Sequence, residues 1–294
     1  MGTLVRRTAL WLTIGCAVLQ IAPLRAAVPM RIVSTSPSIT ETLFALGLGD
    51  RVVGVSTFCR FPAEVVKLPK VGTFLKPEAE LIARLRPDLV VVHEVSNGID
   101  RRLAALRLPF VVVDSGTLAS VFTSIRQIGS AAGVGNRAAM LVADIQRRLA
   151  SVRGAAGSAP RPRVLFIIGR RPGTLTDLVA VGPGSYINDL IEIAGGANVL
   201  AIAGQPEYPR ISMETVLRLD PDVIVDTVDM GETEAERVQR QPVNERLWQA
   251  YGSLTAVKTR RLHAVTTDAL VIPGPRVVEA AEWVATLLRE RGGR

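Results

Sequence analysis

The chain has 294 residues, which is enough for two domains of ordinary size that each bury a hydrophobic core. Its formal net charge of +8 comes mostly from arginines scattered along the sequence, and aromatic residues make up only 4% of the total. Nucleic-acid binding requires a concentrated basic stripe with stacking aromatics, so we expect no nucleic-acid partner.

The first residues are typical of an export signal. Arg6 and Arg7 precede an uncharged apolar run over residues 8–22, and small residues suited to cleavage follow it. An uncleaved membrane anchor would need about 20 apolar residues, and this run is shorter. We predict that residues 1–26 are a signal peptide, and that the mature protein is periplasmic with a net charge of about +5 after the loss of three arginines.

The chain has two cysteines. Cys16 lies in the predicted signal, where it could carry a lipid anchor, but Thr13 stands where lipoprotein signals usually have leucine. Cys59 is then the only cysteine of the mature chain, so no internal disulfide is possible. An inert thiol is the simpler interpretation of Cys59.

Strands and helices alternate through the first half of the mature chain. A strand over residues 31–34 leads into a helix that begins near Ser38 and stops at Gly47, with Ser38 and Glu41 at the spacing of a capping box. Such alternation implies parallel strands joined by right-handed crossovers, which form an α/β lobe. Further strands are predicted at 52–55, 89–92 and 110–113, and further helices at 101–106 and 118–132.

One stretch of the sequence occurs twice without a gap. Residues 80–92 read ELIARLRPDLVVV, and residues 214–226 read ETVLRLDPDVIVD. Each copy predicts a short helix, a Pro-Asp turn and a buried strand, because an apolar helical pattern stops before proline and a β-branched run follows. The copies lie too far apart for a solenoid repeat, so they indicate two similar lobes.

A long helical stripe separates these lobes. Residues 136–153 carry apolar side chains at helical spacing, and a stretch rich in Gly, Ala and Pro follows. We therefore predict an N-terminal α/β lobe at 27–134, a helix and linker at 135–157, and a C-terminal α/β lobe at 158–294. In the second lobe we expect strands at 164–168 and 262–265, and helices at 186–193, 243–250 and 276–289.

The motifs that enzymes usually display are missing from the sequence. We find no nucleophile elbow, no metalloprotease motif and no phosphate-binding lysine loop, and only His93 and His263 are available as imidazole ligands. A cleft between two lobes suits ligand capture instead, because loops after the strand ends line such a crevice. By this rule the lining comes from residues 58–62, 74, 93, 179–185, 208–210 and 268–273.

Several short motifs match a known family. They are both Pro-Asp repeats and Arg31-Ile32-Val33-Ser34, Ser36-Pro37-Ser38, Thr40-Glu41, Val53-Gly54-Val55, Cys59-x-x-Pro62 and Leu68-Pro69-x-Val71-Gly72. The chain thereby resembles the periplasmic substrate-binding proteins for vitamin B12, haem and iron siderophores over nearly all of residues 31–290, and in detail the cobalamin-binding branch. The resemblance implies two Rossmann-like lobes with central parallel sheets, joined by a single long helix.

The same resemblance implies a protein without catalysis and without a cofactor of its own. It would capture a ligand in the cleft and deliver it to the permease subunits of an inner-membrane ABC transporter, and we expect it to be a monomer. Glu80 and Glu214 match the family's docking glutamates, which engage arginines of the permease, one from each lobe. A carboxylate at a helix start also stabilises its own helix, so that alternative stays open.

Ligand contacts carry over residue by residue from the cobalamin-binding branch. The resemblance implies five ligand-binding residues, which are Phe58, Phe74, His93, Tyr208 and Asp268. His93 stands where a tryptophan is expected, and Ile272 where an arginine is expected. We predict a cobalt corrinoid similar to vitamin B12 as the ligand.

Other ligands and another class of protein stay open as alternatives. Haem would take an axial histidine or tyrosine, which His93 or Tyr208 could supply, and His93 could also coordinate cobalt, although a strand-end histidine bonded to backbone is the simpler interpretation. Two-lobed transferases and metal-chelating enzymes have a similar interlobe site. A ferric siderophore would require convergent arginines, for which the candidates are Arg60, Arg170, Arg171, Arg210 and Arg276.

Overall fold

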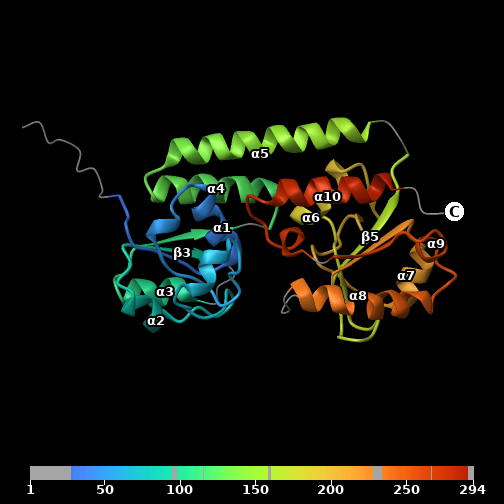
Figure 1. Cartoon of the computed structure of the whole chain (residues 1–294), viewed down its shortest axis with the longest axis horizontal. Helices are drawn as coiled ribbons and strands as arrows, with labels where there is room; N and C mark the ends of the chain where they lie inside the picture. Colours follow the sequence, from blue (N-terminus) through green and yellow to red (C-terminus); the bar gives the residue numbers. More distant parts are fainter. Residues whose placement is uncertain are drawn as a thin grey trace, which may run out of the picture.

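A computed structural model of the chain shows two α/β lobes side by side, with one long helix running along both (Figure 1). This confirms the predicted fold class. Within the part of the chain that the structure describes, no helix is long and apolar enough to cross a membrane. The predicted signal peptide lies outside the described residues, which are 28–94, 98–114, 116–157, 160–227, 234–265 and 267–290.

The first lobe is built on a four-stranded parallel sheet in the order β2-β1-β3-β4. In the central strand β3 (Leu89–His93), Leu89 and Val91 pack into one hydrophobic cluster and Val90 and Val92 into another. Both faces of the sheet are therefore covered, as is usual for parallel sheets. The other elements are β1 (Ile32–Ser34), α1 (Pro37–Ala45), η1 (Gly49–Arg51), β2 (Val52–Gly54), η2 (Ala63–Lys67), α2 (Ala79–Arg84), α3 (Ile99–Ala105), β4 (Phe110–Val113) and α4 (Leu118–Ala131).

The second lobe has a six-stranded mixed sheet in the order β10-β9-β5-β6-β8, with β7 also paired to β5. Strands β6 and β8 are antiparallel to their neighbours, and the others are parallel. The sequence predicted a loop at 179–185, because a strand as short as β6 leaves no periodic signal. The elements are β5 (Arg163–Gly169), β6 (Leu178–Ala180), α6 (Tyr186–Ile193), β7 (Ala197–Asn198), β8 (Arg210–Ile211), α7 (Met213–Leu219), β9 (Val223–Thr227), α8 (Glu234–Gln249), α9 (Thr255–Lys258), β10 (Leu262–Val265), η3 (Asp268–Leu270) and α10 (Val277–Arg289).

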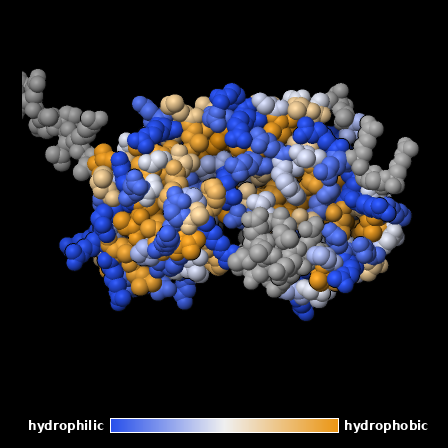
Figure 2. Space-filling view, viewed as in Figure 1, coloured by the Kyte–Doolittle hydropathy of each residue, from blue (hydrophilic) through white to orange (hydrophobic). Residues whose placement is uncertain are grey.

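The long helix α5 (Gly135–Ala156) packs on α4 of the first lobe and on α6 and α10 of the second. Its buried face belongs to one hydrophobic core that reaches into both lobes, so packing along α5 holds the lobes relative to each other. On the outside, a broad hydrophobic area lies over the first lobe (Figure 2). The division of the chain at residues 134 and 157 stays a prediction.

The repeated stretch forms the same unit in each lobe, as α2 and β3 and as α7 and β9. Its aspartate accepts the backbone N–H of an arginine at the start of the neighbouring strand. Asp88 accepts from Arg31, just before β1, at 2.8 Å, and Asp222 accepts from Arg163, the first residue of β5, at 2.7 Å. The guanidinium of each arginine donates to carbonyls at the C-terminal end of the helix in the repeat, α2 for Arg31 and α7 for Arg163. The duplicated unit therefore sets the register of the central strand pair in both lobes.

The start of α1 differs from the prediction. Ser36 is the N-cap, and its hydroxyl accepts the N–H of Ile39, while Pro37 occupies the first turn. Proline is favoured there because its φ is preset and it has no N–H to satisfy, which moves the helix start before Ser38. Glu41 therefore has no capping role and instead contacts the second lobe.

Candidate functional site

A pocket of about 350 Å³ lies between the two lobes. The first lobe contributes residues that follow β1 and β2 and the end of β3, and the second contributes the ends of β9 and β10 and the residues beyond β10. Ligand sites of open α/β sheets form at the carboxyl ends of strands in this way. The lining residues are Ser36, Pro37, Ser38, Phe58, Arg60, Phe74, His93, Thr227, Val265, Thr267, Asp268, Val271, Ile272 and Pro273.

Four of the five predicted ligand residues line this pocket, namely Phe58, Phe74, His93 and Asp268. The rings of Phe58 and Phe74 pack edge to face, with centroids 6.4 Å apart and an interplanar angle of 66°. This geometry is favourable for aromatic pairs. Phe58 is still 40% exposed, so it forms part of the pocket surface rather than the core.

Tyr208 lies elsewhere. It is half-buried in the segment before β8 and is not among the residues that line the pocket. Burial, together with the charge of Glu207, raises the pKa of the Tyr208 hydroxyl to about 12, so it stays protonated. The predicted lining segment 179–185 is also absent from the pocket walls. Its first two residues belong to β6, and Val181 and Ser185 beyond them are buried.

The pocket also includes residues that were not predicted from the sequence to line it. Ser36 and Ser38 come from the start of α1, and Thr227 from the end of β9. Thr227 directly follows the second copy of the repeat, just as His93 directly follows the first, and this equivalence was the signal available in the sequence. The buried Thr227 hydroxyl has no hydrogen-bond partner among the described residues.

His93 is the last residue of β3 and faces the pocket. Burial lowers the pKa of its imidazole below the ordinary 6.5, and the carboxylates of Asp114 and Glu94 oppose this only in part. Neutral imidazole is the form that coordinates metals. Among the described residues, no group of three or more His, Cys, Asp and Glu could hold a metal ion.

Asp268 belongs to an ion-pair network that joins the lobes. Arg276 donates from Nη2 to Asp268 Oδ1 at 3.1 Å and from Nε to Glu41 Oε2 at 2.8 Å. Burial opposes the positive charge of Arg276, but the hydrogen bonds and charge of Glu41 outweigh it and raise the pKa of Arg276 well above its ordinary value. Burial is the larger influence on Glu41 and raises the pKa of its carboxyl above the usual 4.5.

Carboxylates already pair with three of the five arginines that could have received an anionic ligand. Arg170 pairs with Asp226, Arg171 with Asp177, and Arg276 with Glu41 and Asp268. Of the other two, Arg60 lines the pocket and Arg210 lies exposed on β8. Little uncompensated positive charge therefore converges on the site.

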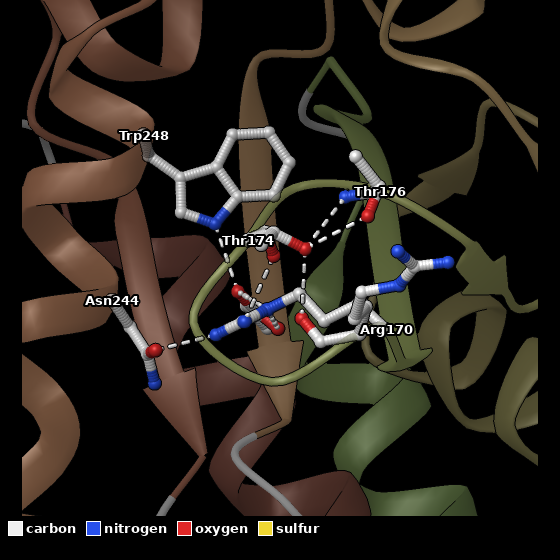
Figure 3. Close-up of polar contacts among 7 residues, drawn as sticks. Arg170, Thr174, Thr176, Asn244 and Trp248 are labelled. Atoms are coloured by element: carbon white, nitrogen blue, oxygen red, sulfur yellow. Dashed lines mark hydrogen bonds and ion pairs between the residues drawn. The ribbon is translucent and has the colours of Figure 1, made fainter.

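A buried polar network surrounds Arg170 in the second lobe (Figure 3), and its carboxylate, Asp226, directly precedes Thr227. Asp226 accepts from Arg170 Nε at 3.1 Å and from Trp248 Nε1 at 2.8 Å, and Arg170 also donates to Asn244. The side chains of Arg170 and Asp226 are only 6% and 2% exposed. Trp248 and Asn244 belong to α8, so the network ties this helix to the end of β9 and positions Thr227.

The two predicted docking glutamates are exposed in the first turns of α2 and α7. Figure 1 shows these helices in different lobes, both on the side away from α5. Glu80 accepts two hydrogen bonds from Arg102 of α3, at 2.9 and 2.8 Å. The backbone N–H of Glu80 and this arginine hold the pKa of the Glu80 carboxyl below its usual range, so it is charged at neutral pH.

Cys59 lies in the core of the first lobe. It is buried and hydrogen-bonded to the hydroxyl of Thr40 at 3.1 Å. Burial raises the pKa of its thiol to about 11, and thiols react as thiolates. This agrees with the expectation of an inert thiol.

Two α/β lobes held by a helix around a mainly apolar interlobe pocket define a ligand-binding protein. Residues 32–269 match the family described as periplasmic binding protein, and the chain belongs to that family. It is therefore a non-enzymatic, extracytoplasmic substrate-binding protein of an ABC transporter. The alternative of a transferase or metal-chelating enzyme is wrong.

Three comparisons show the range of its relatives. The chain is 32% identical over 265 residues to the uncharacterized ABC transporter substrate-binding lipoprotein YvrC of Bacillus subtilis, with 87% of this chain and 79% of the relative covered. It is 30% identical over 286 residues to the vitamin B12-binding protein of Vibrio cholerae, with 94% and 96% covered. The apo structure of the periplasmic heme-binding protein RhuT from Roseiflexus matches with a TM-score of 0.76 and 29% identity, covering 88% of this chain and 97% of that one.

Proposed function

We propose that the protein captures a cobalt corrinoid similar to vitamin B12 in the interlobe pocket. The lining of the pocket is the main support for this proposal. The first lobe contributes the Phe58–Phe74 pair, and the second lobe contributes Ile272, Pro273 and Asp268. Aromatic and aliphatic side chains suit the faces of a large macrocycle, and a carboxylate suits the carboxamide groups at its edge. The similarity to the vitamin B12-binding protein of Vibrio cholerae supports the same ligand class.

The delivery step is part of the same proposal. Glu80 and Glu214 engage arginines of two permease subunits in the inner membrane, and the protein acts as a periplasmic monomer after removal of residues 1–26. Their exposure on equivalent helices of the two lobes supports this role. A lipid anchor at Cys16 is the alternative mode of retention, since the YvrC relative is a lipoprotein.

Haem is the second candidate ligand. Two observations favour it. His93 lies in the pocket wall with a neutral imidazole, and the protein is similar to the heme-binding protein RhuT. Ferric siderophores are the weaker choice, because they are commonly anionic and most of the candidate arginines are already paired.

The test is a thermal-shift and calorimetric panel on the mature protein with cyanocobalamin, cobinamide, haem and several ferric siderophores. A ligand at one hundred times its Kd stabilises the folded state by about 2.7 kcal/mol. We expect the largest rise in Tm with the corrinoids, at one-to-one stoichiometry. A dominant response to haem would select the second candidate, and no response to any of these compounds would reject both.

Visible spectra of His93→Ala test axial coordination. Cyanocobalamin carries both of its axial ligands, so we expect identical spectra for its complexes with wild type and variant. Haem offers open axial positions, so coordination by His93 would appear as a shift of the haem bands that is lost in the variant. Because burial lowers the pKa of His93, this coordination should persist below pH 6.5 and disappear only as the pH falls through the lowered value.

The matched control is His263→Ala. His263 lies on β10, its pKa is also lowered by burial, and it does not line the pocket. Its replacement should leave the spectra of both complexes unchanged. Identical haem spectra for wild type and His93→Ala would exclude axial coordination by His93.

A further inference from the structure

A buried ion pair joins the two lobes beside the pocket. Glu41 lies on α1 of the first lobe, and Arg276 immediately precedes α10 of the second. Their side chains are 2% and 12% exposed. The contact is bidentate, from Arg276 Nε to Glu41 Oε2 at 2.8 Å and from Nη2 to Oε1, which is the strongest geometry between a guanidinium and a carboxylate.

The same guanidinium contacts other segments of the site. Nη2 donates to Oδ1 of the pocket residue Asp268 at 3.1 Å, and Cζ lies 4.3 Å from the centroid of the Phe61 ring, next to the pocket residue Arg60. The backbones of the lobes also approach here, since a Cβ on Gly274 would lie 3.5 Å from Ser38 Cα. Arg276 thus connects pocket-lining segments of both lobes.

We propose that Arg276, held by Glu41, is a positioning residue that sets the width of the cleft and orients the Asp268 carboxylate toward the ligand. The ligand class rests on the proposed function, but the contact between the lobes is made by side chains of the protein alone. A cleft that is preset in this way loses little conformational freedom on binding, which favours affinity.

The arrangement also selects the chemistry of the ligand edge. Arg276 donates its hydrogen bond to Oδ1 of Asp268, so Oδ2 of the same carboxylate can accept from a donor on the ligand. Two carboxylates surround one guanidinium, and Asp268 therefore presents negative charge to the pocket. Carboxamide N–H groups fit this edge, whereas carboxylate groups of a ligand are repelled.

Two variants separate positioning from stability. Arg276→Met leaves Glu41 buried without its partner, so we expect a lower Tm and at least about tenfold weaker binding of cyanocobalamin. The double variant Glu41→Leu with Arg276→Met replaces the pair with apolar side chains of similar size, which is often neutral for stability. We expect the double variant to regain most of the lost Tm and to keep the weakened binding, because Asp268 still lacks its partner.

The control is Arg148→Ala. Arg148 of α5 forms an exposed ion pair with Glu282 of α10 at 3.0 Å, so its loss should change neither Tm nor affinity appreciably. Recovery of both Tm and cyanocobalamin affinity in the double variant would reduce the pair to a structural role and overturn the proposal.

A second measurement needs no ligand. Spin labels on cysteines introduced at the exposed positions Lys76 and Gln205 report the distance between the lobes, and buried Cys59, with its raised pKa, does not compete for the label. We expect a narrow distance distribution in the unliganded protein and a broader one in both Arg276 variants. A distance distribution that the variants leave unchanged would overturn the proposal. If the variants broaden the distribution but the protein binds no corrinoid, the positioning role of Arg276 is upheld and the proposed ligand is rejected.

Discussion

Replacing Glu80 and Glu214 together by alanine is expected to abolish uptake through the transporter while leaving ligand affinity unchanged. Each carboxylate is exposed on its own lobe and lies outside the pocket. Losing one partner of a buried, hydrogen-bonded charge pair costs about 2–5 kcal/mol at an interface, so losing two lowers affinity for the permease by roughly a thousandfold or more. Single variants should retain part of the uptake.

Uptake is measured in proteoliposomes that contain the purified transporter, and ligand binding by calorimetry on the isolated protein. The control removes two other exposed carboxylates, Asp144 of α5 and Glu282 of α10, and so makes the same change in net charge at the α5 side of the molecule. It should transport normally apart from a small change in association rate. Normal uptake by the Glu80 and Glu214 double variant would contradict the docking role and leave both residues as helix-start carboxylates.

Arg170→Met is expected to destabilise the protein by about 3–5 kcal/mol, because it leaves the Asp226 carboxylate buried without its guanidinium partner. The side chain of Asp226 is only 2% exposed, so water cannot replace the lost charge. Asp226 of β9 also accepts from Trp248, and Arg170 donates to Asn244, so the attachment of α8 depends on this pair. Ligand binding should weaken as well, since Thr227, the residue directly after Asp226, lines the pocket.

The neighbouring residue supplies the control for this prediction. Arg171 forms an ion pair with Asp177 in which the two side chains are 66% and 50% exposed. Exposed pairs contribute about 0–1 kcal/mol, so Arg171→Met should hardly change the free energy of unfolding. Both variants are compared by urea denaturation followed by circular dichroism. If both variants lower the free energy of unfolding by the same small amount, the buried network does not stabilise the second lobe.

Local sequence patterns were sufficient for most of the fold. The helix over 186–193 and the strand over 262–265 have the predicted bounds, and the repeated stretch correctly indicated two similar lobes. These features depend on residues close together in the chain, through the period of apolar side chains and the turns that end them. The loops after the strand ends were equally predictable as the place where a pocket forms.

Contacts between distant segments were not predictable in this way. Glu41 has the local spacing of a capping residue, yet it pairs with Arg276 of the other lobe. Tyr208 follows the family pattern of the ligand residues, yet it lies outside the pocket walls. These outcomes depend on how the two lobes pack along α5, and the free energy of such packing comes from burial and charge pairing that no local pattern contains.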